Sequence, residues 1–160
     1  MILLGTRLVR PGLHMGPALP SDVSVIASLL ALAAGDCLPV GEGEILRRLG
    51  EFEVARAPSG TVVGCAAVRG ERERAELRCL AVHPGWRGAG VGRLLVERAM
   101  QRAFAAGEAL FCVSRKPTWF ESLGFSRLPA SEVPDRPGAV PAGRHALIRR
   151  REHARLKKAI

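Results

Sequence analysis

The residues best suited to chemistry form a basic, glycine-rich turn that follows an apolar run ending at Val82. The turn reads Arg87-Gly-Ala-Gly-Val-Gly-Arg93. Glycines let a ligand approach the backbone closely, and the N–H groups at the start of a helix favour an anion. Arg87 and Arg93 add cationic donors that match phosphate oxygens. This pattern predicts an anion site, and a pyrophosphate is the expected ligand.

Two common phosphate-binding motifs do not fit the turn. A Walker loop requires Gly-Lys followed by Ser or Thr, which the turn lacks. The dinucleotide fingerprint has its third glycine where this chain has Arg93. A turn without a ligand would not need three glycines and two arginines at the start of a helix.

The elements around the turn follow from the spacing of apolar residues. Residues 75–82 alternate as in a strand, and residues 90–106 carry apolar side chains at helical spacing before Gly107. Further strands are expected at residues 6–10, 52–57, 61–68, 109–114 and 145–150, further helices at 22–34, 42–49 and 117–123, and a loop at 129–143. Antiparallel-looking strands followed by strand, helix, strand and helix predict an α/β fold with a mixed sheet.

The 160 residues, 48% of them apolar, predict a single domain over 1–160 with a core at about 6–150 and a basic tail at 151–160. No run of eighteen apolar residues and no secretory cleavage pattern occurs, so we expect a cytoplasmic protein that does not span a membrane.

The distribution of charge and the spacing of the cysteines indicate which binding partners and metals to expect. The formal net charge is +9, but residues 144–158 contribute six of these charges, so nucleic acid is not an expected partner of the main body. The four cysteines are far apart, without a CxxC pair or a histidine at ligand spacing. We therefore expect buried free thiols and no metal site.

Leu80-Ala-Val-His-Pro followed by Arg87-Gly-Ala-Gly-Val-Gly92 resembles the acetyl-coenzyme A signature of the GNAT superfamily of N-acetyltransferases. Trp119 to Phe125 resembles that family's aromatic helix ending in Gly-Phe. The resemblance implies a mostly antiparallel sheet with a splayed central strand pair, helices on both faces, and direct acetyl transfer from acetyl-coenzyme A to a small-molecule amine. The coenzyme contacts it implies are Leu80, Ala81, Val82, Arg87, Gly88, Ala89, Gly90, Val91, Gly92, Arg93, Trp119 and Phe120.

Within the superfamily, residues from about Arg7 to Arg150 are similar to the acetyltransferase domain of N-acetylglutamate synthases. The matching pieces are Glu44–Phe52, Gly64–Ala67, Ala75–Val82, Leu110–Ser114 and Gly143–His145. This implies acetylation of the α-amino group of glutamate or a related amino acid, and it allows a homodimer. The alternatives are another small amine, a protein N-terminus, or a non-catalytic module that binds coenzyme A or nucleic acid.

Glu76 is the candidate general base, because acetyl transfer needs a deprotonated amine and the resemblance places a catalytic glutamate there. Period-two alternation puts Glu76 on one strand face with Arg78 and Leu80. The alternative is a solvated carboxylate paired with Arg74 or Arg78. The sequence contains no tyrosine, which many members use as the general acid, and Phe120 stands in that place.

The resemblance instead points to Ser114 as the acid, although water could suffice because a thiolate is a good leaving group. Arg115 and Arg144 are the candidates for binding acceptor carboxylates. This chain departs from the synthase pattern at Val40, where that group has an arginine. His83 is expected to be a loop residue of the signature rather than a catalyst.

Overall fold

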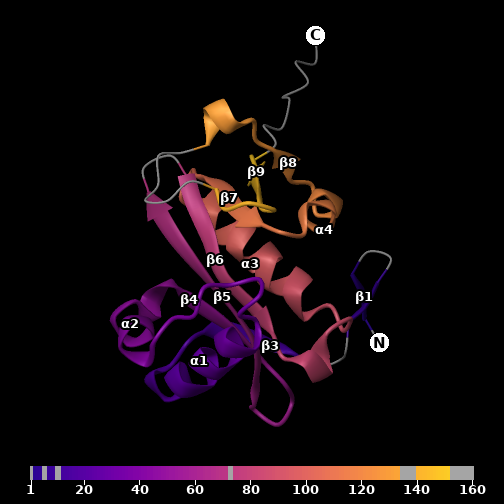
Figure 1. The fold of residues 1–160 in the computed structure, drawn as a ribbon. Helices are drawn as coiled ribbons and strands as arrows, with labels where there is room; N and C mark the ends of the chain where they lie inside the picture. The colour runs from indigo at the N-terminus through magenta and orange to yellow at the C-terminus, as the bar shows by residue number, and fades with distance from the viewer. Residues whose placement is uncertain (1, 5–6, 10–11, 72–73, 134–139, 152–160) are drawn as a thin grey trace.

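The computed structural model describes residues 2–4, 7–9, 12–71, 74–133 and 140–151. Its centre is a seven-stranded sheet in the order β3-β4-β5-β6-β7-β9-β8 (Figure 1). Neighbouring strands are antiparallel except β6 and β7, which are parallel. The strands are β3 (His14–Pro17), β4 (Phe52–Arg56), β5 (Val62–Glu71), β6 (Arg74–Val82), β7 (Ala109–Ser114), β8 (Ser126–Arg127) and β9 (His145–Arg149). The mixed, mostly antiparallel sheet expected from the sequence is confirmed.

Helices cover both faces of the sheet. The helices are α1 (Val23–Leu32), α2 (Glu42–Arg47), α3 (Val91–Ala105) and α4 (Pro117–Ser122), and single 3-10 turns cover Pro20–Asp22, Leu49–Glu51, Pro84–Trp86 and Ala130–Glu132. Buried side chains of α1 and α2 form one core with one sheet face, and those of α3 and α4 form a second core with the other. The apolar residues that repeat at helical spacing in the sequence are those that face this core, since Leu95, Ala99 and Ala103 of α3 are all buried.

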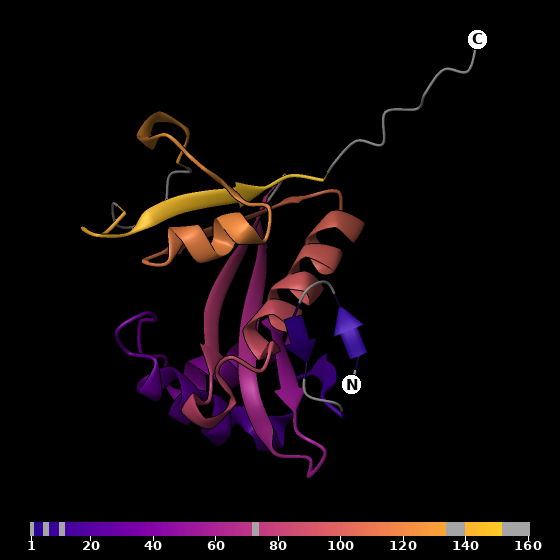
Figure 2. The same ribbon diagram turned by 90° about the vertical axis from the view of Figure 1, so that its right-hand side faces the viewer.

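The central strands β6 and β7 separate soon after they begin to pair. Their register covers only Arg74–Glu76 against Ala109–Phe111, although β6 continues to Val82 and β7 to Ser114. In the later part of β6, the backbone N–H and C=O groups on the edge that faces β7 therefore do not pair with that strand. In Figure 2, β9 runs across β5 and β6 rather than along them. The splayed strand pair implied by the resemblance is confirmed.

A bulge in β6 changes which side chains share a face. Cys79 has φ +54°, and it and Leu80 together lie opposite the single residue Ala66 of β5. Leu77 and Leu80 consequently belong to the α3-side core, whereas Cys79 belongs to the α1-side core. Glu76 and Leu80 face opposite sides, so the even alternation predicted from the sequence was wrong beyond residue 78.

The N-terminal strands also differ from expectation. Of the strand predicted at residues 6–10, Arg7–Val9 forms β2, which pairs with β1 (Ile2–Leu4) in a separate two-stranded sheet. The main sheet starts instead at β3, which reads His-Met-Gly-Pro and lies where no strand was predicted. Edge position explains the miss, because an edge strand tolerates the glycine and proline that a central strand excludes.

Two further expectations concern the C-terminal third. The segment predicted as one loop at 129–143 contains a 3-10 turn at Ala130–Glu132, and residues 134–139 lie outside the described residues. Residues 152–160 of the basic tail also lie outside them. Among the described residues, no helix is long and apolar enough to cross a membrane.

Candidate active site

The glycine-rich turn forms the start of α3. Gly88 and Gly90 have φ of +76° and +85°, and Gly90 is the N-cap of the helix. These positive angles suit glycine and turn the chain sharply from the 3-10 turn into α3. Ala89 and Val91 are buried, 6% and 1% exposed, and anchor the turn in the core. The N–H of Ala89 donates to the carbonyl of Trp86 at 3.3 Å, and the N–H of Leu94 donates to the carbonyl of Gly90 at 3.1 Å. The N–H groups of the first helical turn precede that intrahelical bond and can therefore face an anion.

Charges at this helix start favour an anion. The first turn of α3 contains no acidic residue. Arg87 is exposed beside the turn, whereas Arg93 forms an ion pair with Glu97 one helical turn later, with Nε and Oε1 2.9 Å apart. Of the two arginines predicted to bind phosphate, Arg87 is the one not engaged in such a pair among the described residues.

His83 stabilises the turn itself. Its Nδ1 accepts a hydrogen bond from the N–H of Gly85 at 3.0 Å and caps the 3-10 turn Pro84–Trp86. This contact gives the histidine a structural role in the turn, and the expectation that it is not a catalyst stays a prediction.

The aromatic helix α4 packs beside the turn. A Cβ atom on Gly92 would lie 3.6 Å from the Trp119 ring, so that ring covers the first turn of α3. Phe120 is only 5% exposed, and its ring stacks edge-on with Trp119 at 4.8 Å and with Phe125 at 5.2 Å between centroids. Phe120 is thus a core residue, and its role as a coenzyme contact stays a prediction.

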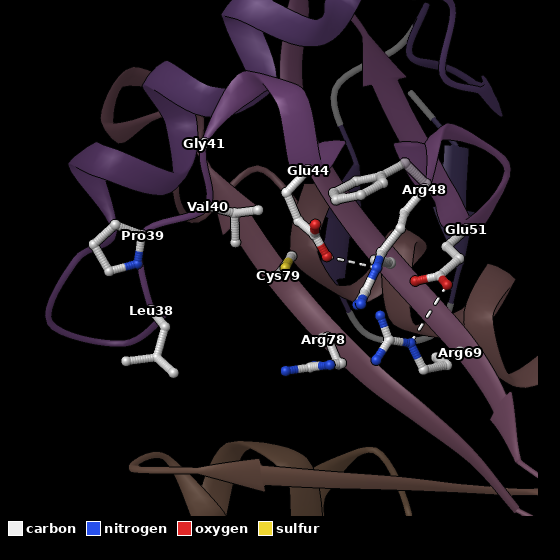
Figure 3. Close-up of a pocket in the computed structure, with 12 residues that line it drawn as sticks. Leu38, Pro39, Val40, Gly41, Glu44, Arg48, Glu51, Arg69, Arg78 and Cys79 are labelled. Atoms are coloured by element: carbon white, nitrogen blue, oxygen red, sulfur yellow. Dashed lines mark hydrogen bonds and ion pairs between the residues drawn. The ribbon is translucent and has the colours of Figure 1, made fainter. Parts of the chain in front are cut away.

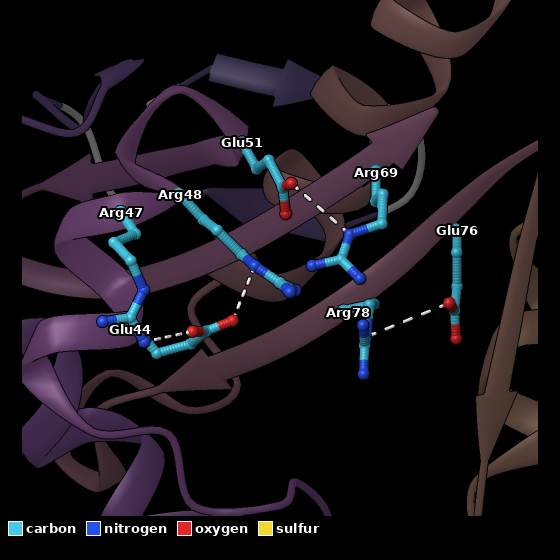
Figure 4. Close-up of polar contacts among 7 residues, drawn as sticks. All are labelled: Glu44, Arg47, Arg48, Glu51, Arg69, Glu76 and Arg78. Atoms are coloured by element: carbon cyan, nitrogen blue, oxygen red, sulfur yellow. Dashed lines mark hydrogen bonds and ion pairs between the residues drawn. The ribbon is translucent and has the colours of Figure 1, made fainter. Parts of the chain in front are cut away.

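Glu76 lies at the point where β6 and β7 begin to separate. It is the last residue of β6 in register with β7, and it pairs across the sheet with Arg69 of β5. Its Oε2 is 3.9 Å from Nε of Arg78, beyond hydrogen-bond distance (Figure 4). The half-buried carboxylate thus stands at the apex of the strand opening, on the sheet face that α2 also borders.

The loop between α1 and α2 is tied to the free edge of β6. The thiol of Cys37 donates a hydrogen bond to the carbonyl of Leu80, with Sγ and O 3.2 Å apart. Burial raises the pKa of the Cys37 thiol to about 11, so the thiol keeps its proton at neutral pH and can act as this donor. Cys65 and Cys112 are buried free thiols, as expected from the sequence.

A cavity of about 480 Å3 opens between α2 and β6. Glu76 does not line it, but Arg78, which lies 3.9 Å from the Glu76 carboxylate, does. Its lining is Leu38, Pro39, Val40, Gly41, Glu44, Arg48, Glu51, Phe52, Ala67, Arg69, Arg78 and Cys79 (Figure 3). Three arginines and two glutamates therefore share one cavity with an apolar wall from the loop at 38–41. Such a cavity suits a small polar molecule that carries an anionic group.

The other predicted site residues gather at the far end of the opening. Ser114 ends β7, and its Oγ accepts the backbone N–H of Lys116 at 3.0 Å, which leaves its hydroxyl proton available as a donor. Arg144 donates from Nη1 to the carbonyl of Asp36 at 2.8 Å, and Lys116 pairs with the Asp36 carboxylate at 2.9 Å. Arg115 is exposed and does not line the cavity.

Sequence reasoning did not identify Arg48 and Arg69 as site residues and gave Arg78 no role beyond pairing with Glu76. Arg69 reaches the cavity only because the register of β5 and β6 puts it opposite Glu76. Arg48 follows α2 and points into the cavity from the neighbouring layer (Figure 3). The one signal in the sequence that could have found Arg78 was its spacing from Glu76, because residues two apart on a strand share a face, as they do here.

A strand pair that opens beside a glycine-rich helix start, with a carboxylate at its apex, is the arrangement that the sequence resemblance implied. A model of the acetyltransferase (GNAT) domain matches residues 48–127, half of the chain. The chain belongs to the GNAT acetyltransferase family.

Several relatives have related names. An amino-acid acetyltransferase of Aeromonas salmonicida is 29% identical over 82% of this chain and 31% of its own length. One of Azotobacter vinelandii is 38% identical over 56% of this chain and 23% of its own length. This chain thus spans about a fifth to a third of the curated relatives it matches.

Two solved structures share the fold. N-acetylglutamate synthase of Neisseria gonorrhoeae, complexed with coenzyme A and N-acetyl-glutamate, has a TM-score of 0.78 and 25% identity, over 88% of this chain and 35% of that one. Rv2747 of Mycobacterium tuberculosis, in complex with CoA and NLQ, has a TM-score of 0.77 and 23% identity, over 84% of this chain and 97% of that one.

Proposed function

We propose that this protein transfers the acetyl group of acetyl-coenzyme A to the α-amino group of an amino acid, with glutamate as the first acceptor to test. The observation that carries the proposal is the position of Glu76. Glu76 lies on β6 at the apex of the β6–β7 opening, two residues before Arg78, which lines the cavity. The names of the synthase and amino-acid acetyltransferase relatives support the same acceptor class.

The coenzyme would lie along the free edge of β6 with its pyrophosphate at the start of α3. Gly88 and Gly90 leave the backbone N–H groups accessible there, and the helix dipole adds to their effect. The pantetheine arm would follow the backbone of Leu80, Ala81 and Val82, which continues past the last residue paired with β7. The thioester would then reach the level of Glu76.

Glu76 would accept the proton of the acceptor ammonium, so that the neutral amine attacks the thioester carbonyl. A backbone N–H of the open strand edge would stabilise the negative oxygen of the tetrahedral intermediate. When this intermediate collapses, the C–S bond breaks, and the coenzyme thiolate takes a proton from Ser114 or from water. No covalent enzyme intermediate and no metal is required for these steps.

The wider setting of the enzyme is also part of the proposal. We infer one acetyltransferase domain, a cytoplasmic location, a small-molecule acceptor and no nucleic-acid partner. The apolar composition and the confined basic segment support these inferences.

The decisive experiment measures thiol release from acetyl-coenzyme A with a panel of amino acids and polyamines. Glu76→Gln should lower kcat about 10²- to 10⁴-fold, because it removes the general base but keeps the size of the side chain. Coenzyme affinity should not change. Glu121→Gln is the matched control, because Glu121 lies on α4, is paired with Arg127 and does not line the cavity. Turnover that Glu76→Gln leaves intact would exclude Glu76 as the base, and coenzyme binding without turnover of any amino acid would exclude the acceptor class.

A further inference from the structure

The three arginines of the cavity differ in how firmly they are held. Nε of Arg48 is 2.6 Å from Oε1 of Glu44, and Nε of Arg69 is 3.4 Å from Oε1 of Glu51. Arg78 forms only the 3.9 Å contact with Glu76 among the described ion pairs (Figure 4). A carboxylate ligand would therefore displace no hydrogen-bonded partner from Arg78, whereas it would compete with Glu44 or Glu51 for the other two.

The backbone directs Arg78 into the cavity. Arg78 pairs across the sheet with Ala67, whose small side chain leaves room for a long guanidinium on that face. The bulge at Cys79 follows directly, so the side chain of Cys79 lies on the same sheet face as Arg78 instead of the opposite one. The Arg78 side chain is 35% exposed, so the head group is reachable by a ligand while the stem is packed.

Val40 faces the same cavity from the opposite wall. An apolar residue there leaves the loop at 38–41 without a cationic side chain, since it reads Leu-Pro-Val-Gly. Any anionic group that enters the cavity must therefore find its positive partner on α2 or on the sheet. Of the arginines that line the cavity, Arg78 is the one nearest in sequence to Glu76, and its Nε is 3.9 Å from the Glu76 carboxylate, so a group bound by Arg78 would lie near the base.

We propose that Arg78 binds a carboxylate of the amino-acid acceptor and so determines the preference of this enzyme for acidic over uncharged acceptors, with Arg48 adding positive charge on the far side. This inference rests on the proposed function. The planar guanidinium can donate two parallel hydrogen bonds to one carboxylate. It assigns to β6 a role that the sequence had assigned to Arg115 and Arg144.

The contacts of those two residues support the reassignment. Nη1 of Arg144 donates a hydrogen bond to the carbonyl of Asp36, and this bond connects the α1–α2 loop to the start of β9. Arg115 is exposed and outside the cavity. Arg144 is thus suited to holding the loop against the start of β9, whereas Arg78 lines the open volume.

The test compares kcat/KM of the wild type and Arg78→Met for glutamate, glutamine and glutamate α-amide. These acceptors remove one carboxylate at a time and keep the size of the molecule. Arg78→Met should lose about ten- to hundredfold in kcat/KM for the acceptors that carry the recognised carboxylate, mostly through KM, and change little for the amide that lacks it. Arg78→Lys should show a smaller loss of the same selectivity, because lysine keeps the charge but not the fork.

Arg74→Met is the matched control. Arg74 is also two residues from Glu76 on β6, but its Nη1 donates to the carbonyl of Glu132 at 3.3 Å. An effect that worked only through the charge near Glu76 would lower activity with acid and amide acceptors alike and would appear in both variants. Equal loss for all acceptors, or an unchanged preference in Arg78→Met, would overturn the inference and leave the proposed function intact. Absence of amino-acid turnover by the wild type would instead overturn the proposed function itself.

Discussion

At the scale of single residues, the site depends on which hydrogen-bonding capacity is already used. The Oγ atom of Ser114 accepts one backbone N–H, so its orientation is defined while its proton stays available. Nε of Arg93 is engaged by Glu97, and Nδ1 of His83 accepts the N–H of Gly85, so each already holds local structure in place. Neighbouring contacts therefore decide the role of each polar residue.

Ser114→Ala tests the proposed general acid. If the hydroxyl protonates the departing thiolate, kcat should fall by about 10²-fold while the KM for acetyl-coenzyme A stays constant. Measuring kcat with thioesters of more acidic thiols gives a second readout, because a better leaving group needs less protonation and the loss should shrink. Ser122→Ala is the control, since the Ser122 hydroxyl donates only to a carbonyl within α4. A kcat equal to that of the wild type would assign the proton to water.

At the scale of elements, the strand β6 and the helix α3 position different parts of the candidate site. The opening from β7 frees one edge of β6, and the bulge at Cys79 separates the face with Glu76 and Arg78 from the face that carries Leu80. The start of α3 then offers its N–H groups at the end of the same strand. One strand therefore runs from Glu76 and Arg78 to the glycine-rich turn.

Gly88→Ala tests the anion site against its own control. Gly88 and Gly107 both have φ of +76°, and an added Cβ would meet nothing within 4 Å at either. The backbone strain of alanine, about 1–2 kcal/mol, should therefore be similar at both positions. Only Gly88→Ala should also raise the KM for acetyl-coenzyme A, because Gly107 lies past the far end of α3. Equal KM values in the two variants would place the pyrophosphate elsewhere.

At the scale of the whole molecule, an almost buried ion pair links the α1 layer to the sheet. The two terminal nitrogens of Arg56, at the end of β4, donate hydrogen bonds to the carboxylate of Asp22. This carboxylate also accepts the N–H of Leu19 at 2.7 Å. The hydrogen bond from Arg56 lowers the pKa of Asp22, although burial opposes the change. The carboxylate is 7% exposed, so loss of its partner would leave a charge in the interior.

Arg56→Met should therefore lower the free energy of unfolding at pH 7 by roughly 3–5 kcal/mol, as measured by urea denaturation. Because the folded pKa of Asp22 lies below its ordinary value of 3.8, the stabilisation is present above about pH 4 and is lost as the pH falls through the folded pKa. The difference between variant and wild type should shrink over that range. A difference of under 1 kcal/mol at pH 7 would show that the pair contributes as little as an exposed one.

The sequence alone predicted the glycine-rich turn, the helix after it, most of the strands and the place of Glu76 on its strand. These features depend on local backbone chemistry and on regular spacing, both of which are readable along the chain. The edge strand at His14–Pro17 and the bulge at Cys79 were not readable, because pairing partners rather than residue types create them. Tertiary structure also decided the cavity, since Arg48, Arg69 and Arg78 come from three elements that meet only after the sheet and α2 have packed. Strand register and layer packing, which the order of residues does not show, determine which charges face one another.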